Sequence, residues 1–236
     1  MQLKGKTVWI TGSGRGIGSA VAKVLAAKGA RVVVSARTED EITMVAGEIN
    51  AEGDSALAVR CDVRDAKQIA ALVEQTRELW GDIDVLINNA GIAHFKRIVD
   101  TSEEEWDQMM ETNLRSAFLC SKAVLPAMIE RHAGHIINIV SVAGVQPYHK
   151  AGGYCASKFG LYGFTEVLRL ETRNCGVKVT AVMPGATSTD IWGSRDVDFG
   201  RMMAPEDVAR VILSVLEADD RAMIESVVLR PQEGDL

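Results

Sequence analysis

Short apolar runs rich in β-branched residues alternate along this chain with longer segments whose apolar residues recur at helical spacing. The short runs predict strands buried on both faces, and the longer segments predict helices. Strands are expected at 7–11, 31–35, 55–60, 84–88, 135–140, 177–183 and 222–229. Helices are expected at about 16–28, 39–51, 66–80, 102–131, 153–175 and 205–218. Strands separated by helices predict an α/β fold, a doubly wound parallel sheet of about seven strands with helices on both faces.

The length of the chain, 236 residues, suits one domain of this kind and is short for two, so we expect residues 1–236 to form a single domain. A net charge of -6 gives no reason to expect nucleic acid or an anionic membrane as a partner. Apolar runs are far shorter than the roughly 20 residues that span a bilayer, and the first residues lack the apolar core of a signal peptide. These features predict a cytoplasmic protein without a membrane segment.

The four cysteines, Cys61, Cys120, Cys155 and Cys175, are scattered along the chain. None has the C-x-x-C or Cys/His spacing that zinc sites and redox pairs use. We therefore expect free thiols in a reducing compartment and no metal site.

A glycine-rich turn follows the first predicted strand and reads Gly-Ser-Gly-Arg-Gly-Ile-Gly over residues 12–18. In a doubly wound sheet, this turn is the usual phosphate site. Its glycines let the backbone approach a pyrophosphate, and the next helix offers N–H groups to the negative charge. The spacing is G-x-x-x-G-x-G rather than the general dinucleotide fingerprint, and a tight turn without a ligand remains an alternative. The candidate contacts are Gly12, Ser13, Gly14, Arg15, Gly16, Ile17 and Gly18.

A hydroxyl, a phenol and an ammonium group follow the fifth predicted strand. Ser141 comes directly after that strand, and Tyr154 is followed four residues later by Lys158. On a helix, Tyr154 and Lys158 share a face. A neighbouring ammonium favours the phenolate and lowers the tyrosine pKa from its ordinary ~10, which makes Tyr154 a candidate proton donor. The spacing is common by chance, so the pair needs the other parts of a site.

With Asn-Asn-Ala-Gly at 88–91 and Asn113, these motifs resemble those of the short-chain dehydrogenase/reductase family over nearly the whole chain. The resemblance implies a Rossmann-type fold and an oxidoreductase that uses a nicotinamide cofactor. It implies that Tyr154 protonates the substrate carbonyl oxygen, that Lys158 lowers the pKa of Tyr154 and binds the nicotinamide ribose, and that Ser141 hydrogen-bonds the substrate oxygen. Asn113 is implied to hold a water that links Lys158 to solvent. These roles suit the residue types, because hydride transfer to a carbonyl creates an alkoxide that needs stabilisation and a proton.

The same resemblance implies cofactor contacts at the ends of other strands. Asn89, Ala90 and Gly91 follow the fourth strand on the adenine ribose side, although asparagines there could simply stabilise the turn. Asp62 and Val63 follow the third strand, where the family places an aspartate near the adenine amino group. The contacts implied near the nicotinamide and the diphosphate are Pro184, Gly185, Thr187 and Thr189.

The end of the second strand bears on the choice between NAD and NADP. Users of NAD carry an acid there for the ribose 2′-hydroxyl, and that acid would repel a 2′-phosphate. This chain has Ala36 followed by Arg37, and Arg15 lies in the glycine turn. Both guanidinium groups could pair with a 2′-phosphate, whereas Glu39 and Asp40 fit the first turn of a helix. The expected cofactor is therefore NADP(H), with contacts at Ala36 and Arg37.

The loop 142–152 and a lid segment at about 187–203 are expected to border the substrate pocket. The lid carries Ile191, Trp192, Phe199 and Met202, which indicate a partly apolar and mobile cover. Packing within the lid or against a second subunit explains these side chains about as well. The identity of the substrate therefore stays open at this stage.

The leading hypothesis is an NADPH-dependent reductase of a small ketone or aldehyde, similar to carbonyl reductases of the 3-oxoacyl carrier-protein reductase type. The enzymatic alternative is reduction of 3-oxoacyl thioesters on an acyl carrier protein, and the alternative of another class is a dinucleotide-binding regulator without turnover. An acidic carrier would need a basic surface near the pocket. The candidates for that surface are Arg131, Lys150, Arg169 and Arg173, which solvated helix faces explain equally well.

The predicted helices 102–131 and 153–175 carry many small and apolar residues. In the family these helices pair across a two-fold axis, and such faces suit isologous packing. A homo-oligomer, either a dimer or a tetramer, is therefore expected, although burial against the chain's own sheet explains part of the pattern.

Overall fold

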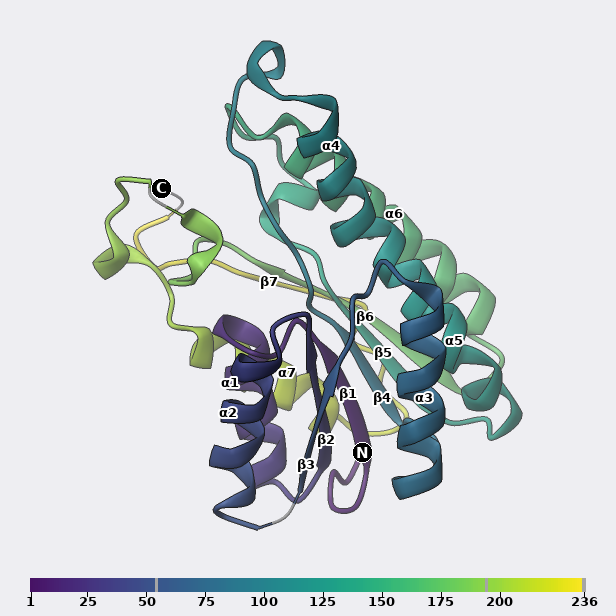
Figure 1. Cartoon of the computed structure of the whole chain (residues 1–236). Helices are drawn as coiled ribbons and strands as arrows, with labels where there is room; N and C mark the ends of the chain where they lie inside the picture. The colour runs from purple at the N-terminus through teal and green to yellow at the C-terminus, as the bar shows by residue number, and fades with distance from the viewer. Residues whose placement is uncertain (54, 194, 235–236) are drawn as a thin grey trace.

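A computed structural model of the chain describes residues 1–53, 55–193 and 195–234 (Figure 1). In these residues seven strands form one parallel sheet in the order β3-β2-β1-β4-β5-β6-β7. The strands are β1 (Thr7–Thr11), β2 (Arg31–Ala36), β3 (Ala56–Arg60), β4 (Val85–Asn88), β5 (Gly134–Ile139), β6 (Val177–Pro184) and β7 (Ser226–Leu229). The predicted doubly wound parallel sheet is therefore confirmed.

Helices cover both faces of this sheet (Figure 1). The α-helices of the described residues are α1 (Gly16–Ala27), α2 (Glu39–Asn50), α3 (Ala66–Trp80), α4 (Glu103–Met110), α5 (Ser116–Glu130), α6 (Gly152–Thr172) and α7 (Pro205–Glu217). Apolar residues of α1, α2 and α7 form one core with one face of the sheet, and those of α3, α5 and α6 form a second core with the other face. Strands buried on both sides explain why their sequences are continuous apolar runs rather than alternating ones.

The region predicted as one helix at 102–131 is helical from 103 to 130, but it is not α-helical throughout. It begins as expected, because Ser102 caps α4 in a capping box with Glu105 and acidic residues fill the first turn. After Met110 the chain makes a π-helical turn, η2 (Glu111–Arg115), before α5 resumes. Such turns insert one residue into the helical ladder and are frequent at functional sites. The predicted helical region at 102–131 is therefore confirmed, and the π-helical turn at its centre was not predicted.

The last predicted strand is also shorter than its apolar run. The sequence indicated 222–229, whereas β7 spans only Ser226–Leu229. This strand lies at the sheet edge, where only β6 pairs with it, so fewer of its residues are held in the ladder. Among the helices of the described residues, none has the length and apolar character needed to cross a membrane.

The strand order reverses at β1, which lies between β2 and β4. The chain proceeds from β1 to β2 and β3 on one side, and from β4 to β7 on the other. In open α/β sheets a crevice forms at the carboxyl ends of the strands at such a switch point, and ligands bind there. The site is therefore expected where β1 and β4 end.

Candidate active site

A cavity of about 1440 Å³ runs along the carboxyl edge of the sheet at this switch point. Its walls come from the glycine turn, the ends of β2 to β6, the loop 142–152 and the segment after β6. Most of the site residues predicted from the sequence line it, including Tyr154 and Lys158. Three of them do not: Ser13, Gly18 and Asn113.

The glycine turn lies so close to the end of β4 that side chains do not fit between them. Gly12 has a φ of +62°, and a Cβ there would lie 2.9 Å from the Cα of Ala90. Asn89 fastens the two segments, because its Nδ2 donates to the carbonyl oxygens of Thr11 (2.9 Å) and Gly12 (3.0 Å). The asparagine of the 88–91 motif therefore holds the turn in place while it also lines the cavity.

Ser13 and Gly18 shape this turn from behind the cavity wall. The Ser13 hydroxyl donates to the carbonyl of Ile10 (2.7 Å) and accepts from the N–H of Ser35 (2.8 Å), which ties the turn to β1 and β2. A Cβ on Gly18 would lie 2.5 Å from the carbonyl oxygen of Gly12. Both residues were predicted as cofactor contacts, and the structure places them in the support of the turn.

At the far end of the cavity, Ala36 and Arg37 form the wall after β2, as the sequence predicted. The other predicted cation, Arg15, lies 3.2 Å from Asp190 Oδ2 and 3.6 Å from Glu41 Oε1. Sequence reasoning missed Glu41, which also lines the cavity. Its position in the first acidic turn of α2 gave no sign that it would face the glycine turn.

Asp62 and Val63 also line this end of the cavity. Asp62 is held by Arg64, whose Nε and Nη2 donate to the Asp62 carboxylate at 3.0 and 2.7 Å. The hydrogen bonds from the Arg64 side chain are the main reason why the pKa of Asp62 falls below its ordinary value. Arg64 is a second residue that the sequence did not reveal, because no motif includes it.

Ser141, Tyr154 and Lys158 meet at the other end of the cavity, where β5 ends and α6 begins. Tyr154 and Lys158 lie one turn apart on α6, with the Lys158 Nζ 5.8 Å from the centre of the Tyr154 ring. The Lys158 Nζ donates to the carbonyl of Ile139 at 2.8 Å, at the end of β5. The Ser141 hydroxyl donates to the carbonyl of Pro184 (3.3 Å) and accepts from the N–H of Ala143 (3.1 Å). The expected convergence of the three groups is therefore present.

Burial is the main cause of the pKa shifts of Tyr154 and Lys158. It raises the pKa of Tyr154 to about 12, and the Ser141 hydroxyl offsets part of that rise by favouring the phenolate. Burial also lowers the pKa of Lys158 to about 7. The sequence implied that Lys158 lowers the pKa of Tyr154, whereas the loss of water around both groups is the larger effect here.

Asn113 lies in the turn η2, behind the cavity wall. Its Nδ2 donates to the carbonyl of Ile92 and to Ser157 Oγ, both at 2.9 Å, and its Oδ1 accepts from the N–H of Ile92 at 2.8 Å. A Cβ on Gly91 would lie 3.4 Å from Asn113 Oδ1 and 3.6 Å from Lys158 Nζ. The structure therefore places Asn113 and Lys158 on either side of Gly91. The amide of Asn113 is already hydrogen-bonded to Ile92 and Ser157.

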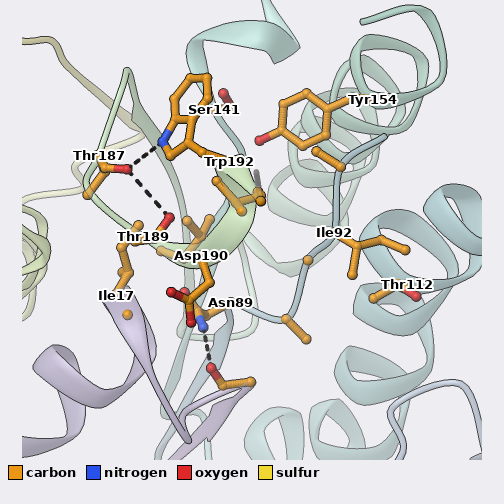
Figure 2. Close-up of a pocket in the computed structure, with 18 of the residues that line it drawn as sticks. Ile17, Asn89, Ile92, Thr112, Ser141, Tyr154, Thr187, Thr189, Asp190 and Trp192 are labelled. Atoms are coloured by element: carbon orange, nitrogen blue, oxygen red, sulfur yellow. Dashed lines mark hydrogen bonds between the residues drawn. The ribbon is translucent and has the colours of Figure 1, made fainter. Parts of the chain in front are cut away.

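The segment after β6 closes the cavity above the glycine turn. Pro184, Gly185, Thr187 and Thr189 line it as predicted. The carbonyl oxygen of Thr187 accepts hydrogen bonds from the Trp192 indole N–H, at 2.8 Å, and from the Thr189 hydroxyl (Figure 2). A Cβ on Gly16 would lie 3.2 Å from Thr189 Cγ2, so the lid segment touches the turn.

The lid and its surroundings differ in part from the prediction. Ile191 and Trp192 line the cavity, whereas Phe199 and Met202 do not. Phe95 also lines the cavity and lies 5.7 Å from the Tyr154 ring, centre to centre. The sequence did not reveal Phe95, because it follows the 88–91 motif in a loop without periodicity.

A sequence model described as short chain dehydrogenase matches residues 6–198. The chain belongs to the short chain dehydrogenase family. It is 37% identical over 236 residues to a sepiapterin reductase of Chlorobaculum tepidum, which covers 96% of both chains. It is 32% identical to an uncharacterised oxidoreductase of Staphylococcus saprophyticus, over 98% of this chain and 99% of the relative. The chain is therefore an oxidoreductase of this family.

Two solved structures share the architecture. One is a metagenomic short-chain oxidoreductase in complex with NADP, with 36% identity and a TM-score of 0.86 over 98% of this chain and 99% of that one. The other is an alcohol dehydrogenase from the archaeon Thermococcus sibiricus complexed with 5-hydroxy-NADP, with 28% identity and a TM-score of 0.91 over 98% of both chains. The Rossmann-type fold of the family therefore extends over the described chain.

Proposed function

We propose that this short chain dehydrogenase reduces a ketone or aldehyde carbonyl to an alcohol with NADPH. The observation that carries the proposal is the meeting of Ser141, Tyr154 and Lys158 at one end of a cavity whose other end is the glycine turn. A proton donor, a hydroxyl and a cation beside a dinucleotide-sized cleft suit hydride transfer to a carbonyl.

The cavity suits NADPH in shape and charge. Gly12 and Gly16 have positive φ and line the cavity at the N-terminus of α1, where backbone N–H groups can meet a pyrophosphate. Ala36 occupies the position where users of NAD carry an acidic residue, so no carboxylate there would repel a 2′-phosphate. Arg37 follows it and makes no ion pair among the described residues. The solved relatives with NADP and 5-hydroxy-NADP support this assignment.

When bound, NADPH supplies the hydride that reaches the carbonyl carbon. Tyr154 gives its proton to the carbonyl oxygen, and its raised pKa keeps that proton in place until the oxygen becomes basic. Ser141 hydrogen-bonds the same oxygen, and Lys158 in its charged form stabilises the phenolate left on Tyr154. Asn113 keeps Ile92 and Ser157 in position near Lys158, and the proposal includes a water held by Asn113 that links Lys158 to solvent.

The thioester alternative has less support from the surface charges. Arg131 lies 2.9 Å from Asp82, and Arg169 is buried, where it donates to the carbonyl oxygens of Val179 and Glu225. Of the basic residues considered for a carrier protein, only Lys150 lines the cavity among the described residues. A small free carbonyl compound therefore fits better than a substrate delivered by an acidic carrier.

The test is a screen of NADPH oxidation against ketones, aldehydes, quinones and 3-oxoacyl thioesters, with sepiapterin included because a relative has that name. We expect the highest kcat/KM for a free ketone or aldehyde. No oxidation with any carbonyl compound would contradict carbonyl reduction, and a preference for the thioester would establish the alternative.

The cofactor assignment has a separate test in the dissociation constants of NADPH and NADH. A charge-assisted pair with a phosphate is worth roughly 1.5 to 3 kcal/mol, so Arg37→Ala should weaken NADPH binding by about 10- to 100-fold and leave NADH binding nearly unchanged. Equal binding of both cofactors by the unaltered protein would contradict the assignment.

We also propose a homo-oligomer, a dimer or a tetramer, formed through α5 and α6. These helices leave large apolar side chains exposed, namely Phe118, Phe159, Val167 and Leu170. Large apolar side chains exposed on neighbouring helices favour isologous association. Sedimentation velocity should give a species larger than the 25.5 kDa monomer, and Leu170→Glu should shift it toward the monomer. A monomer at all concentrations would contradict this proposal.

We place the reaction in the cytoplasm. Cys61, Cys120 and Cys155 are buried free thiols and Cys175 is a partly exposed one, which suits a reducing compartment. Fractionation of cells that express the protein would test this location.

A further inference from the structure

Aromatic side chains gather around the position that a reacting carbonyl would take. The chain has only five Phe, four Trp and three Tyr residues, and Phe95, Tyr148, Tyr154 and Trp192 line the cavity. Figure 2 shows Tyr154 and Trp192 across from each other in the same part of the cavity, with the Tyr154 hydroxyl pointing into the space between them. A substrate whose carbonyl oxygen meets Tyr154 would therefore lie among aromatic rings.

Phe95, Trp192 and Arg195 contact one another in pairs. The rings of Phe95 and Trp192 are parallel within 9°, with their centres 5.6 Å apart. The guanidinium carbon of Arg195 lies 4.4 Å from the centre of the Phe95 ring and 5.8 Å from that of Trp192. Phe95 comes from the loop after β4, whereas Trp192 and Arg195 come from the lid segment. We call these three residues the aromatic–cation cluster.

Packing of the lid onto the body explains part of this arrangement, but it does not explain the state of Arg195. Two other arginines near the lid have carboxylate partners: Arg15 pairs with Asp190, and Arg201 lies 3.1 Å from Glu233 Oε2. Among the described residues no ion pair engages Arg195, whose planar group instead lies against aromatic rings. A guanidinium that stacks on aromatic rings keeps its N–H donors available. These donors can bind a hydrogen-bond acceptor on the edge of a planar ligand.

On the basis of the proposed function, we propose that the aromatic–cation cluster selects substrates in which the reacting carbonyl is attached to a flat conjugated ring with a hydrogen-bond acceptor on its far edge. The ring packs beside Phe95 and Trp192 where they line the cavity, and the acceptor binds Arg195. A saturated ring of the same carbon number is thicker and lacks the π-face, so it loses these contacts.

Two substrates with a flat and a saturated ring test the proposal, and the variants below separate ring packing from the effect of conjugation on the reactivity of the carbonyl. We would compare kcat/KM with NADPH for 1-phenylpropane-1,2-dione and 1-cyclohexylpropane-1,2-dione, which share the reacting group and the carbon number. Because an aromatic pair contributes about 0.5 to 1.5 kcal/mol, two ring contacts predict a preference of about 5- to 150-fold for the phenyl compound, mainly through KM. In Phe95→Leu and Trp192→Leu this preference should fall toward equality.

The matched control is Phe199→Leu, the same type of change on an exposed lid residue that does not line the cavity. It should keep the preference of the unaltered protein. For Arg195, the 4-carboxamide of the phenyl compound should gain over the parent compound, and this gain should be lost in Arg195→Met and partly kept in Arg195→Lys. Melting temperature and NADPH affinity show whether each variant is folded.

The outcomes separate this inference from the function on which it rests. Equal reduction of the phenyl and cyclohexyl compounds, or a preference that survives in Phe95→Leu and Trp192→Leu, would overturn the selection and leave carbonyl reduction standing. Absence of NADPH oxidation with every carbonyl compound would overturn the function and the inference together.

Discussion

Burial shifts the pKa values of two residues of the proposed site. Burial moves the pKa of Tyr154 up to about 12 and that of Lys158 down to about 7, so each shift favours the neutral form. A neutral Tyr154 is the form that can donate a proton. A neutral Lys158, in contrast, cannot stabilise a phenolate, so the proposed reduction requires Lys158 in its protonated form.

This requirement predicts a pH dependence. Because the pKa of Lys158 lies near 7, kcat/KM for reduction should be constant below about pH 6 and should fall by about tenfold per pH unit above about pH 8. Initial rates with saturating NADPH across pH 5.5 to 9.5 measure the profile.

The control is Lys158→Arg, in which the charge persists at all these pH values. Whatever activity remains in this variant should lack the fall above neutral pH. A profile of the unaltered protein that is flat up to about pH 9 would contradict the role of the charge.

The sequence was informative for residues that carry chemistry and uninformative for those that only contact them. Tyr154, Lys158 and Ser141 belong to a motif with fixed spacing, and the structure brings them together. Arg64 and Phe95 reach the cavity through the path of their loops, which no spacing encodes. Residue types in a pattern predict reacting groups, whereas the partners of those groups depend on tertiary packing.

Among the elements, the glycine turn and α1 form a unit whose geometry depends on the absence of side chains. Gly18 lies inside α1, where alanine is ordinarily the better helix residue. A Cβ there would nevertheless meet the backbone of Gly12 and Ser13, at 2.5 and 2.7 Å. The backbone of the turn cannot move away from this Cβ without losing its contact with Ala90, which follows β4.

Gly18→Ala should therefore lower the free energy of unfolding by about 1 to 3 kcal/mol and weaken NADPH binding, because the turn must shift. Urea unfolding and cofactor titration measure the two effects.

Gly47→Ala is the matched control, since Gly47 lies in α2 with no atom within 4 Å of its Cβ position. It should raise stability by about 0.5 to 1 kcal/mol and leave NADPH binding unchanged. Equal behaviour of the two variants would contradict the close fit of the turn.

The π-helical turn η2 shows what a pattern of apolar residues does not encode. The sequence from 102 to 131 has helical periodicity on both sides of this turn, so it predicts one helix. The turn is held by contacts to other segments, because the Asn113 amide binds Ile92 and Ser157. Its position depends on residues distant in sequence and could not be predicted from the helix itself.

For the whole molecule, the parallel sheet was predictable because strands buried on both faces read as continuous apolar runs. The order of the strands was not predicted, because no single strand encodes its neighbours and the rule for crossover connections only limits the possible orders. Polar residues inside this sheet were less predictable. His135 on β5 is buried, and its Nε2 lies 2.9 Å from the hydroxyl of Thr180 on β6.

His135 predicts how the stability of the whole fold depends on pH. Burial, with smaller contributions from Lys178 and the terminal amine, lowers the pKa of His135 to about 3. The unfolded chain binds a proton near pH 6.5, and the folded chain does not. Its contribution to stability is therefore complete above about pH 6.5 and is lost as the pH falls toward 3, at about 1.4 kcal/mol per pH unit.

Urea unfolding at pH 7 and pH 5 should show this loss in the unaltered protein. His135→Gln should reduce the difference in the free energy of unfolding between pH 7 and pH 5, because the variant no longer binds this proton when it unfolds. His149→Gln changes an exposed histidine and should leave that difference unchanged. The same pH difference in the His135 and His149 variants would show that His135 is not the group responsible.

The central claim of this account is that Tyr154 donates the proton in carbonyl reduction. Tyr154→Phe removes the hydroxyl and keeps the ring, so the contact with Phe95 and the shape of the cavity are retained. The measurement is kcat on the best carbonyl substrate together with the NADPH dissociation constant. Because general acid catalysis contributes about 10²- to 10⁴-fold, we predict a loss of kcat in that range with NADPH affinity nearly unchanged. A Tyr154→Phe variant that reduces the substrate within a few-fold of the unaltered rate would contradict the claim.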